Sequence, residues 1–169
     1  MFVAQGFGVG RIPFAPGTWG SVVGLGWFAL LLWPGSFLIF ALGTILGLAA
    51  SVWFCGRGEI ILGETDPGSI VLDEIAAIPV CFAVLLLLPW AMNDGHWGLF
   101  EQLFQSKVGL LVLAVGFALF RLFDIWKPWP VKQSQKLPGG WGVTVDDLLA
   151  ALYVNLCWVV LTFYFSRGC

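Results

Sequence analysis

The most constraining feature of this sequence is the run from Ser36 to Gly56, which contains no charged side chain. A helix of this length can cross the roughly 30 Å hydrocarbon core of a bilayer. Four further apolar segments follow the same pattern, at 22–33, 75–93, 108–120 and 148–166. The chain is 59% hydrophobic and 11% charged, against roughly 25% charged in a soluble domain. We therefore expect residues 1–169 to form one domain, an all-α polytopic membrane bundle of about four to five apolar helices.

Two of the apolar segments are short for a membrane span. The run 108–120 reaches spanning length only if its helix continues through Arg121 and Asp124 to Trp126. The run 22–33 stops at a Pro-Gly pair, so it is expected to form a tight hairpin with the run that follows. In the third segment Pro79 should loosen the first helical turns, because proline lacks the backbone N–H donor.

Three polar, glycine-rich stretches separate these segments, at Gly6–Ser21, Gly56–Glu74 and Phe120–Asp147. Two successive crossings return the chain to its starting side, so all three stretches are expected to face one compartment. That side holds most of the basic residues, namely Arg11, Arg57, Arg121, Lys127, Lys132 and Lys136, whereas the other side holds Lys107 and Arg167. The positive-inside bias then predicts that the polar stretches are cytoplasmic. Most acidic residues lie on the same side, and this concentration of charge at one membrane face marks a candidate site.

Carboxylates occur where the apolar segments begin or end. Asp73 and Glu74 open the third segment, Asp146 and Asp147 open the fifth, and Asp124 lies near the end of the fourth. Neighbouring helical residues point about 100° apart, so one member of each pair should face the bundle axis. Such a cluster of hard oxygen ligands suits Mg²⁺ or Mn²⁺. The simpler explanation is that acids at helix starts complement the helix dipole, but an acid at a helix end does not fit it.

Two further stretches could bind an anion. The glycine-rich start exposes backbone N–H groups, and Thr18 or Ser21 could cap the first helix, whose N-terminus would favour phosphate. Arg121 and Lys127 recur with Asp124 at a spacing of three residues and so share a helix face, which Pro128 should end. These two cations could bind phosphate beside the carboxylates, while Trp126 and Trp129 are expected to anchor the chain at the membrane interface.

Several functional classes are excluded by what the sequence lacks. The net charge of −2 and the absence of a basic run argue against nucleic-acid binding. His96 is the only histidine and is expected on the far side, which excludes a phosphatase that uses a histidine nucleophile with a second histidine. Phosphoryl transfer would therefore depend on metal-activated water or on attack by a carboxylate.

Four motifs in order, covering nearly the whole chain, are similar to those of a known family. They are "GFGVG" with "PGTWGS", then "DPGSIVLDE", then "FRLFDIWKPWP", and "GGWGVTVDD". With them the sequence resembles the phosphatidylglycerophosphatase A family, bacterial inner-membrane enzymes. The resemblance implies a phosphoric monoester hydrolase, with Mg²⁺ as cofactor, that cleaves phosphatidylglycerophosphate to phosphatidylglycerol and inorganic phosphate. Carried over by position, it implies as metal ligands the acids Asp66, Asp73, Glu74, Asp124, Asp146 and Asp147.

Within that set we predict that Asp73, Asp124 and one of the adjacent pair Asp146 and Asp147 hold Mg²⁺. Glu74 is then a further ligand or the general base. Arg121 and Lys127 are expected to take part in catalysis and to bind the phosphate, with Thr18 and Ser21 as further substrate contacts. The alternative is a cation-coupled transporter or channel that uses the same carboxylates. Transport sites usually lie near the bilayer midplane, whereas these acids gather at one edge.

Overall fold

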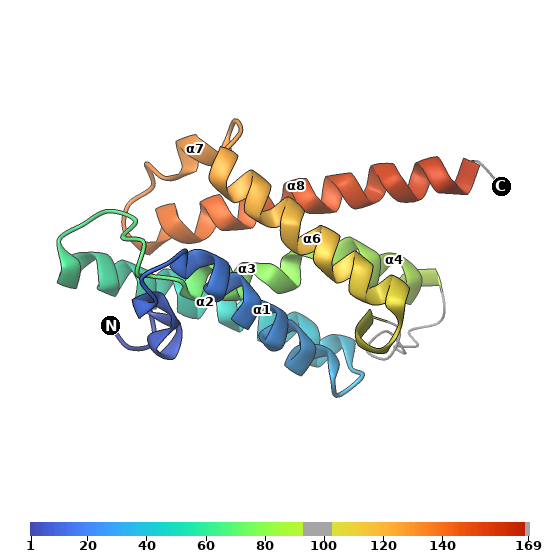
Figure 1. The fold of residues 1–169 in the computed structure, drawn as a ribbon, viewed down its shortest axis with the longest axis horizontal. Helices are drawn as coiled ribbons and strands as arrows, with labels where there is room; N and C mark the ends of the chain where they lie inside the picture. Colours follow the sequence, from blue (N-terminus) through green and yellow to red (C-terminus); the bar gives the residue numbers. More distant parts are fainter. Residues whose placement is uncertain (93–102, 168–169) are drawn as a thin grey trace.

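The computed structural model describes residues 1–92 and 103–167, and these residues form helices without any strand. The elements in chain order are η1 (Gly6–Arg11), α1 (Pro16–Leu32), α2 (Phe37–Leu62), α3 (Leu72–Cys81), α4 (Ala83–Met92), α6 (Lys107–Trp126), α7 (Val131–Ser134) and α8 (Gly140–Arg167) (Figure 1). His96 and the expected end of the third apolar segment lie outside the described residues.

Three of these helices, α2, α6 and α8, are long and apolar enough to cross a membrane, and α1 is a shorter apolar helix. The expectation of an all-α membrane bundle is therefore confirmed. Helix α6 continues through Arg121 and Asp124 to Trp126, as spanning length requires. It ends where Lys127 adopts a left-handed backbone conformation (φ 47°, ψ 59°) directly before Pro128, in agreement with the predicted stop.

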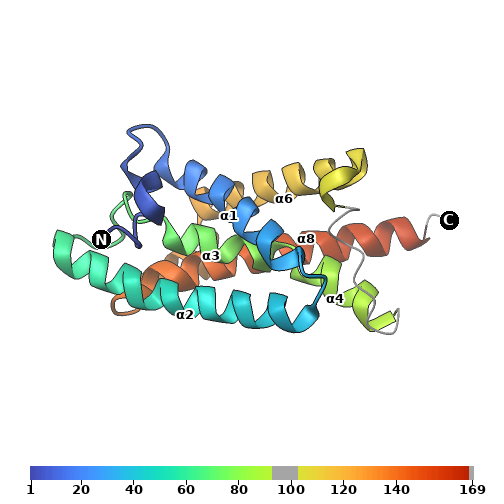
Figure 2. The same cartoon turned by 90° about the horizontal axis from the view of Figure 1, so that it is seen from below.

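The three polar stretches lie together at one end of the bundle. Figures 1 and 2 show η1, the connection from α2 to α3, and the segment from the end of α6 through α7 to the start of α8 gathered there. The turn between α1 and α2 and the end of α8 lie at the opposite end. Residues far apart in the sequence are thus neighbours at this polar end, as the count of crossings predicts.

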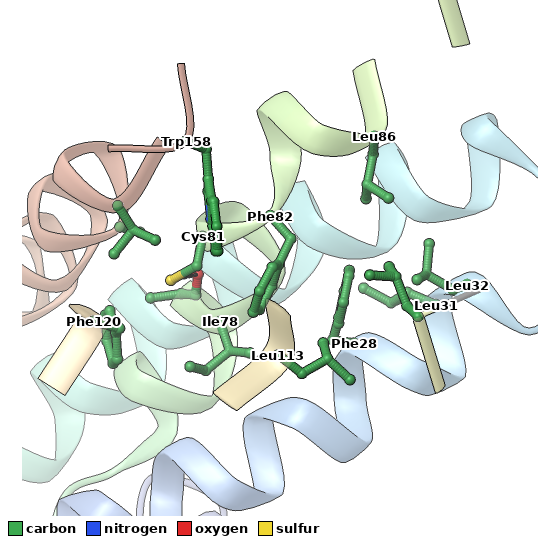
Figure 3. Close-up of a cluster of buried hydrophobic side chains, with 14 of the residues drawn as sticks. Phe28, Leu31, Leu32, Ile78, Cys81, Phe82, Leu86, Leu113, Phe120 and Trp158 are labelled. Atoms are coloured by element: carbon green, nitrogen blue, oxygen red, sulfur yellow. Dashed lines mark hydrogen bonds between the residues drawn. The ribbon is translucent and has the colours of Figure 1, made fainter. Parts of the chain in front are cut away.

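Helix α3 forms the centre of the molecule. It contacts α1, α2, α6 and α8, and most of its side chains are buried. Figure 3 shows the apolar core around it, where Ile78 and Phe82 meet side chains from α1, α6 and α8. The ring of Phe82 stacks on that of Phe28, with the centroids 4.9 Å apart. A buried central helix fixes the position of its own first turn, which carries Asp73 and Glu74.

The third apolar segment is not one helix, because the chain breaks at Phe82 between α3 and α4. Asn155 of α8 satisfies the backbone at this break. Its side-chain oxygen accepts from the N–H of Val84 at 2.8 Å, and its side-chain nitrogen donates to the carbonyl of Val80 at 2.6 Å. The expectation that Pro79 loosens the first turns is wrong, since Pro79 lies near the end of α3.

Helices α1 and α8 both begin earlier than their apolar runs suggest. Helix α1 starts with Pro16 as its first residue, a position that suits proline because the first N–H has no helical acceptor. Its N-cap is Ala15 and no side chain caps it, so the expectation that Thr18 or Ser21 caps this helix is wrong. Helix α8 starts at Gly140. One turn later, the hydroxyl of Thr144 shares a hydrogen bond of 2.8 Å with the hydroxyl of Ser51 in α2.

Candidate active site

A cavity of about 260 Å³ lies at the polar end of the bundle. It is lined by residues from the first turn of α1, the connection between α2 and α3, and helices α3, α6 and α8. The charged residues of the lining are Asp66, Asp73, Glu74, Asp124, Asp146, Asp147, Arg121 and Lys127, and the others are Ala15, Pro16, Gly17, Gly68 and Ile70. All six acids and both cations singled out in the sequence therefore meet in one place.

Arg121 connects α3 and α6 at this cavity. One of its terminal nitrogens, Nη1, donates to Oε1 of Glu74 at 3.0 Å and lies 2.7 Å from Oδ2 of Asp124. The Asp124 contact follows from the i,i+3 spacing on one helix face. The Glu74 contact joins residues 47 positions apart, and only the packing of α3 against α6 produces it. The guanidinium is thus held between two carboxylates.

Lys127 makes the corresponding connection between α6 and α8. Its ammonium nitrogen donates to Oδ2 of Asp146 at 2.6 Å and lies 3.4 Å from Oδ2 of Asp66. Burial alone would lower the pKa of Lys127, but the hydrogen bond and negative charge of Asp146 outweigh burial and raise this pKa. Gln135 donates to the same oxygen of Asp66 at 2.7 Å, so the loop before α3 is tied at two points to the segment between α6 and α8.

Three of the remaining carboxylate oxygens lack partners. Among the described residues, Oδ1 of Asp73, Oε2 of Glu74 and Oδ2 of Asp147 are buried without a hydrogen bond. Burial and the neighbouring charge of Glu74 raise the pKa of Asp73, and burial raises the pKa of Glu74 to about 8 despite the opposing charge of Arg121. Six carboxylates face two cations in this cavity. An orphaned buried oxygen is costly, so the arrangement calls for further positive charge.

The helix dipole does not account for this cluster. Asp73 and Glu74 do lie in the first turn of α3, where negative charge is favoured. Helix α8, however, has no acid in its first turn, and Asp146 and Asp147 lie beyond the reach of its dipole, which fades after one turn. Asp124 lies in the last turn of α6, where an acid is disfavoured. Asp124, Asp146 and Asp147, like Asp66 in the loop between α2 and α3, therefore need another explanation.

Two glycines of α1 make room for Glu74. A Cβ at Gly17 would overlap Oε1 of Glu74, and a Cβ at Gly20 would lie 2.5 Å from Oε2. The first turn of α1 thus packs directly on this carboxylate, and Gly17 also lines the cavity. The backbone N–H groups in the first turn of a helix have no helical acceptor, so Gly17 brings a potential anion-binding donor to the carboxylates.

The donor set fits a divalent metal ion in its chemistry. Mg²⁺ binds carboxylate oxygens and keeps several waters, and the cavity offers three buried, unpartnered carboxylate oxygens from α3 and α8. Within residues 1–92 and 103–167, no three acidic, histidine or cysteine side chains are already close enough to enclose an ion. Arg121 and Lys127 hold some of the oxygens that a metal would use.

The structure also shows a contribution that the sequence reading missed, and two predicted substrate contacts lie outside the lining of the cavity. Gln135, which holds Asp66, was not recognised, because a glutamine in a polar connection carries no local signal. Thr18 and Ser21 do not line the cavity. The hydroxyl of Ser21 is buried and donates to the carbonyl of Gly17 at 2.9 Å. In their place, Ala15, Pro16 and Gly17 form the α1 wall.

Comparison with known proteins places this arrangement in a family. The family model described as Phosphatidylglycerophosphatase A matches residues 2–162. The chain is 36% identical to Phosphatidylglycerophosphatase A of Haemophilus influenzae, over 89% of this chain and 81% of that protein. It is 32% identical to the Escherichia coli protein of the same name, over 89% and 76%. It is also 33% identical, over 90% and 87%, to a Bacteroides thetaiotaomicron protein named "Putative phosphatidylinositol-3-phosphatase".

No solved structure matches the chain, so the assignment depends on sequence. The family match covers almost the full length and includes every residue that lines the carboxylate cavity. The relatives extend over most of their own lengths as well. The chain belongs to the phosphatidylglycerophosphatase A family and is a phosphoric monoester hydrolase.

Proposed function

We propose that this protein removes the terminal phosphate of phosphatidylglycerophosphate in a Mg²⁺-dependent reaction, producing phosphatidylglycerol and inorganic phosphate. The observation that carries the proposal is the cavity in which six carboxylates surround two cations at one end of a membrane bundle. Family membership supplies the reaction class, and the names of two relatives supply the substrate. A site at the end of the bundle would meet a phospholipid headgroup while the acyl chains stay in the bilayer.

In this proposal Asp73, Asp124 and one of Asp146 and Asp147 hold Mg²⁺, with Asp66 able to add an oxygen at the mouth. The unpartnered oxygens of Asp73 and Asp147 support this assignment. A bound Mg²⁺ would supply Lewis acidity toward the phosphate oxygens and would make a bound water more acidic. The cavity supplies no histidine or cysteine for this purpose, so oxygen donors alone define the site.

The other residues handle charge and protons. Arg121 and Lys127 are placed to neutralise phosphate oxygens once their carboxylate partners turn to the metal, and the Gly17 N–H can donate to the same group. Glu74 accepts a proton from the attacking water, whose oxygen forms the new bond to phosphorus. The bond from phosphorus to the glycerol oxygen breaks, and that oxygen takes up the proton that Glu74 accepted and becomes the hydroxyl of phosphatidylglycerol.

We further propose that the cavity opens at the cytoplasmic face of the bacterial inner membrane. The basic residues support this orientation because Arg11, Arg57, Arg121, Lys127, Lys132 and Lys136 belong to the segments gathered at the cavity end. Lys107 begins α6 at the opposite end. An excess of Lys and Arg marks the cytoplasmic side of bacterial membrane proteins.

The test is phosphate release by the purified protein in detergent. We expect hydrolysis of phosphatidylglycerophosphate with Mg²⁺, loss of activity with a chelator, and recovery when Mg²⁺ is added back in excess. Phosphatidylinositol 3-phosphate should be assayed in parallel, because one relative carries that activity in its name. A preference for that lipid would show that phosphatidylinositol 3-phosphate, and not phosphatidylglycerophosphate, is the substrate. Full activity in the presence of the chelator would show that the reaction does not depend on Mg²⁺. Protein without activity on either lipid would leave cation transport through the same carboxylates as the competing explanation.

A further inference from the structure

We propose that an apolar groove on α8 binds an acyl chain of the phospholipid substrate, and we call it the α8 groove. This inference rests on the proposed function and deepens it. The α8 groove has a volume of about 260 Å³ and is lined by Pro130, Leu149, Leu152, Tyr153 and Leu156. The one polar side-chain group among them, the Tyr153 hydroxyl, already donates to the carbonyl of Trp129 at 2.5 Å. The groove therefore presents apolar walls to its contents.

The α8 groove continues the same helix face that lines the carboxylate cavity. Asp146, Leu149, Tyr153 and Leu156 follow one another at spacings of three, four and three residues, which places them in one stripe along α8. With a rise of 1.5 Å per residue, the groove begins about 5 Å along the helix from Asp146. A glycerol unit and a phosphodiester separate the terminal phosphate from the acyl chains, so a lipid whose terminal phosphate lies beside Asp146 brings its acyl chain to the part of the groove farther along α8, toward Leu156.

A second wall is shared as well. Lys127 and Pro130 belong to the same short connection between α6 and α7, and Lys127 lines the carboxylate cavity while Pro130 lines the α8 groove. Tyr153 holds this connection through Trp129 and also stacks on Phe123 of α6, with the ring centroids 5.1 Å apart. Lys127, the proposed phosphate ligand, and Pro130, which lines the groove, thus lie in one connection that the contacts of Tyr153 hold in place.

The direction and length of the groove suit the start of an acyl chain. Helix α8 runs from the polar end of the bundle toward the opposite end (Figure 1), so the groove lies deeper in the membrane than the carboxylates. From Leu149 to Leu156 the helix rises about 10 Å, a third of the roughly 30 Å hydrocarbon core. Leu152 and Leu156 are at least half exposed, which leaves the groove accessible from the lipid.

We expect the groove to act by orienting the substrate and not by adding binding free energy. An acyl chain in the bilayer is already surrounded by hydrocarbon, so moving it into the groove brings little hydrophobic free energy. Holding the chain beside Asp146 and Lys127 instead aligns the phosphate with the reacting groups, and misplacement of a reactant lowers rates steeply. The groove should therefore raise kcat/KM for the lipid and leave hydrolysis of a headgroup without chains unchanged.

A competing hollow of about 250 Å³ lies between η1, α1, α2 and α3, where Trp27, Ala50 and Ile75 are among the lining residues. It is also apolar and could hold a chain. No basic residue lines it, and Arg11 of η1 does not line the carboxylate cavity, whereas the α8 groove is lined by Pro130 of the connection that carries the cavity residue Lys127. This difference favours the α8 groove, and the experiment separates the two.

The experiment compares two substrates and four variants in nanodiscs with Mg²⁺. The substrates are dioleoyl phosphatidylglycerophosphate and its deacylated headgroup. Leu152→Trp and Leu156→Trp fill the α8 groove, Ala50→Phe fills the competing hollow, and Val160→Trp adds the same bulk to an exposed position of α8 outside the groove. We expect both groove variants to lower kcat/KM for the lipid about tenfold and to change headgroup hydrolysis less than twofold. The other two variants should retain lipid hydrolysis within twofold.

Three results would overturn the inference. They are unchanged lipid hydrolysis in both groove variants, an equal loss on lipid and headgroup in both, or a chain-dependent loss in Ala50→Phe alone. If the wild-type protein cleaves the lipid and not the headgroup, the comparison of the groove variants with Val160→Trp at equal thermal stability decides the question. A wild-type protein that cleaves neither substrate signals failure of the proposed function itself, which is a different result from a groove without effect.

Discussion

Nη1 of Arg121 lies 3.0 Å from Oε1 of Glu74 and so ties α6 to the first turn of the central helix α3. Both side chains are largely buried in the carboxylate cavity. Neither the helix start that carries Glu74 nor the helix end that carries Arg121 forms the site alone. Their contact depends on the packing of the bundle, and it fixes the position of the cation that we propose to neutralise the phosphate.

The first prediction concerns this cation. Arg121→Gln removes the positive charge shared by Glu74 and Asp124, and we expect kcat/KM for the lipid to fall by about 10²-fold or more, as for the loss of one transition-state donor. Arg121→Lys should recover part of the activity, because lysine keeps the charge without the planar fork. Arg57→Gln is the control, since Arg57 is exposed and stacks on Trp53 outside the cavity. Steady-state kinetics measures the effect, and near-normal turnover of Arg121→Gln would contradict it.

The second prediction concerns the ion pair of Lys127 and Asp146. Lys127→Met leaves the buried carboxylate of Asp146 without its closest cation, which should lower the free energy of unfolding by about 3 kcal/mol. Adding Asp146→Asn removes the stranded charge and should restore part of that loss. Unfolding in mixed detergent and SDS measures both variants. If the double variant loses as much unfolding free energy as the two single variants together, Lys127 and Asp146 are not coupled.

The third prediction concerns the close approach of α1 to Glu74. Gly17→Ala places a methyl group where Oε1 of Glu74 lies, so the carboxylate must move from Arg121 and activity should fall at least tenfold. Stability should change little, because the displaced atoms end a flexible side chain. Gly26→Ala on the same helix meets nothing within 4 Å and should raise stability by about 0.5–1 kcal/mol at unchanged activity. Equal activities of the two variants would exclude a role for this contact.

The fourth prediction concerns the break between α3 and α4. Asn155→Leu strands the N–H of Val84 and removes a donor to the carbonyl of Val80, and we expect a loss of about 1–3 kcal/mol of unfolding free energy. Thr162→Val is the matched control, because the Thr162 hydroxyl bonds only to carbonyls of its own helix. The loss of unfolding free energy in Thr162→Val should be well under half of the loss in Asn155→Leu. A similar effect of both substitutions would mean that the break does not depend on Asn155.

Local patterns predicted the features that depend on local chemistry. The uncharged runs predicted membrane helices, and the Lys-Pro pair predicted the end of α6. The even number of crossings between polar stretches predicted that the acids of α3, α6 and α8 lie at one end. For the same reason most charged residues of the cavity could be named from sequence, since they lie at or near a boundary between a polar stretch and an apolar run, whereas Asp66 lies within a polar stretch and was named through the family resemblance.

The features that sequence reading missed depend on contacts between distant residues. The break at Phe82 is satisfied by Asn155 of another helix, and the one nearby signal, Pro79, was interpreted as loosening the first turns of the segment. The early start of α8 at Gly140 overrides the weak helix propensity of a glycine- and valine-rich stretch, because Gly140 packs against the α2 backbone. The proline that starts α1 was a usable signal, but we assigned it to the polar stretch Gly6–Ser21 before the first apolar run.

The most direct test of the central claim is the turnover of Asp73→Asn on phosphatidylglycerophosphate with Mg²⁺. The substitution keeps the shape of a buried side chain whose Oδ1 has no partner and removes only its charge. If the cavity carboxylates hold the metal, kcat should fall by about 10³-fold or more at unchanged or higher thermal stability, while Glu64→Gln, an exposed acid outside the cavity, retains full activity. Turnover of folded Asp73→Asn within a few-fold of the wild-type rate would contradict the account.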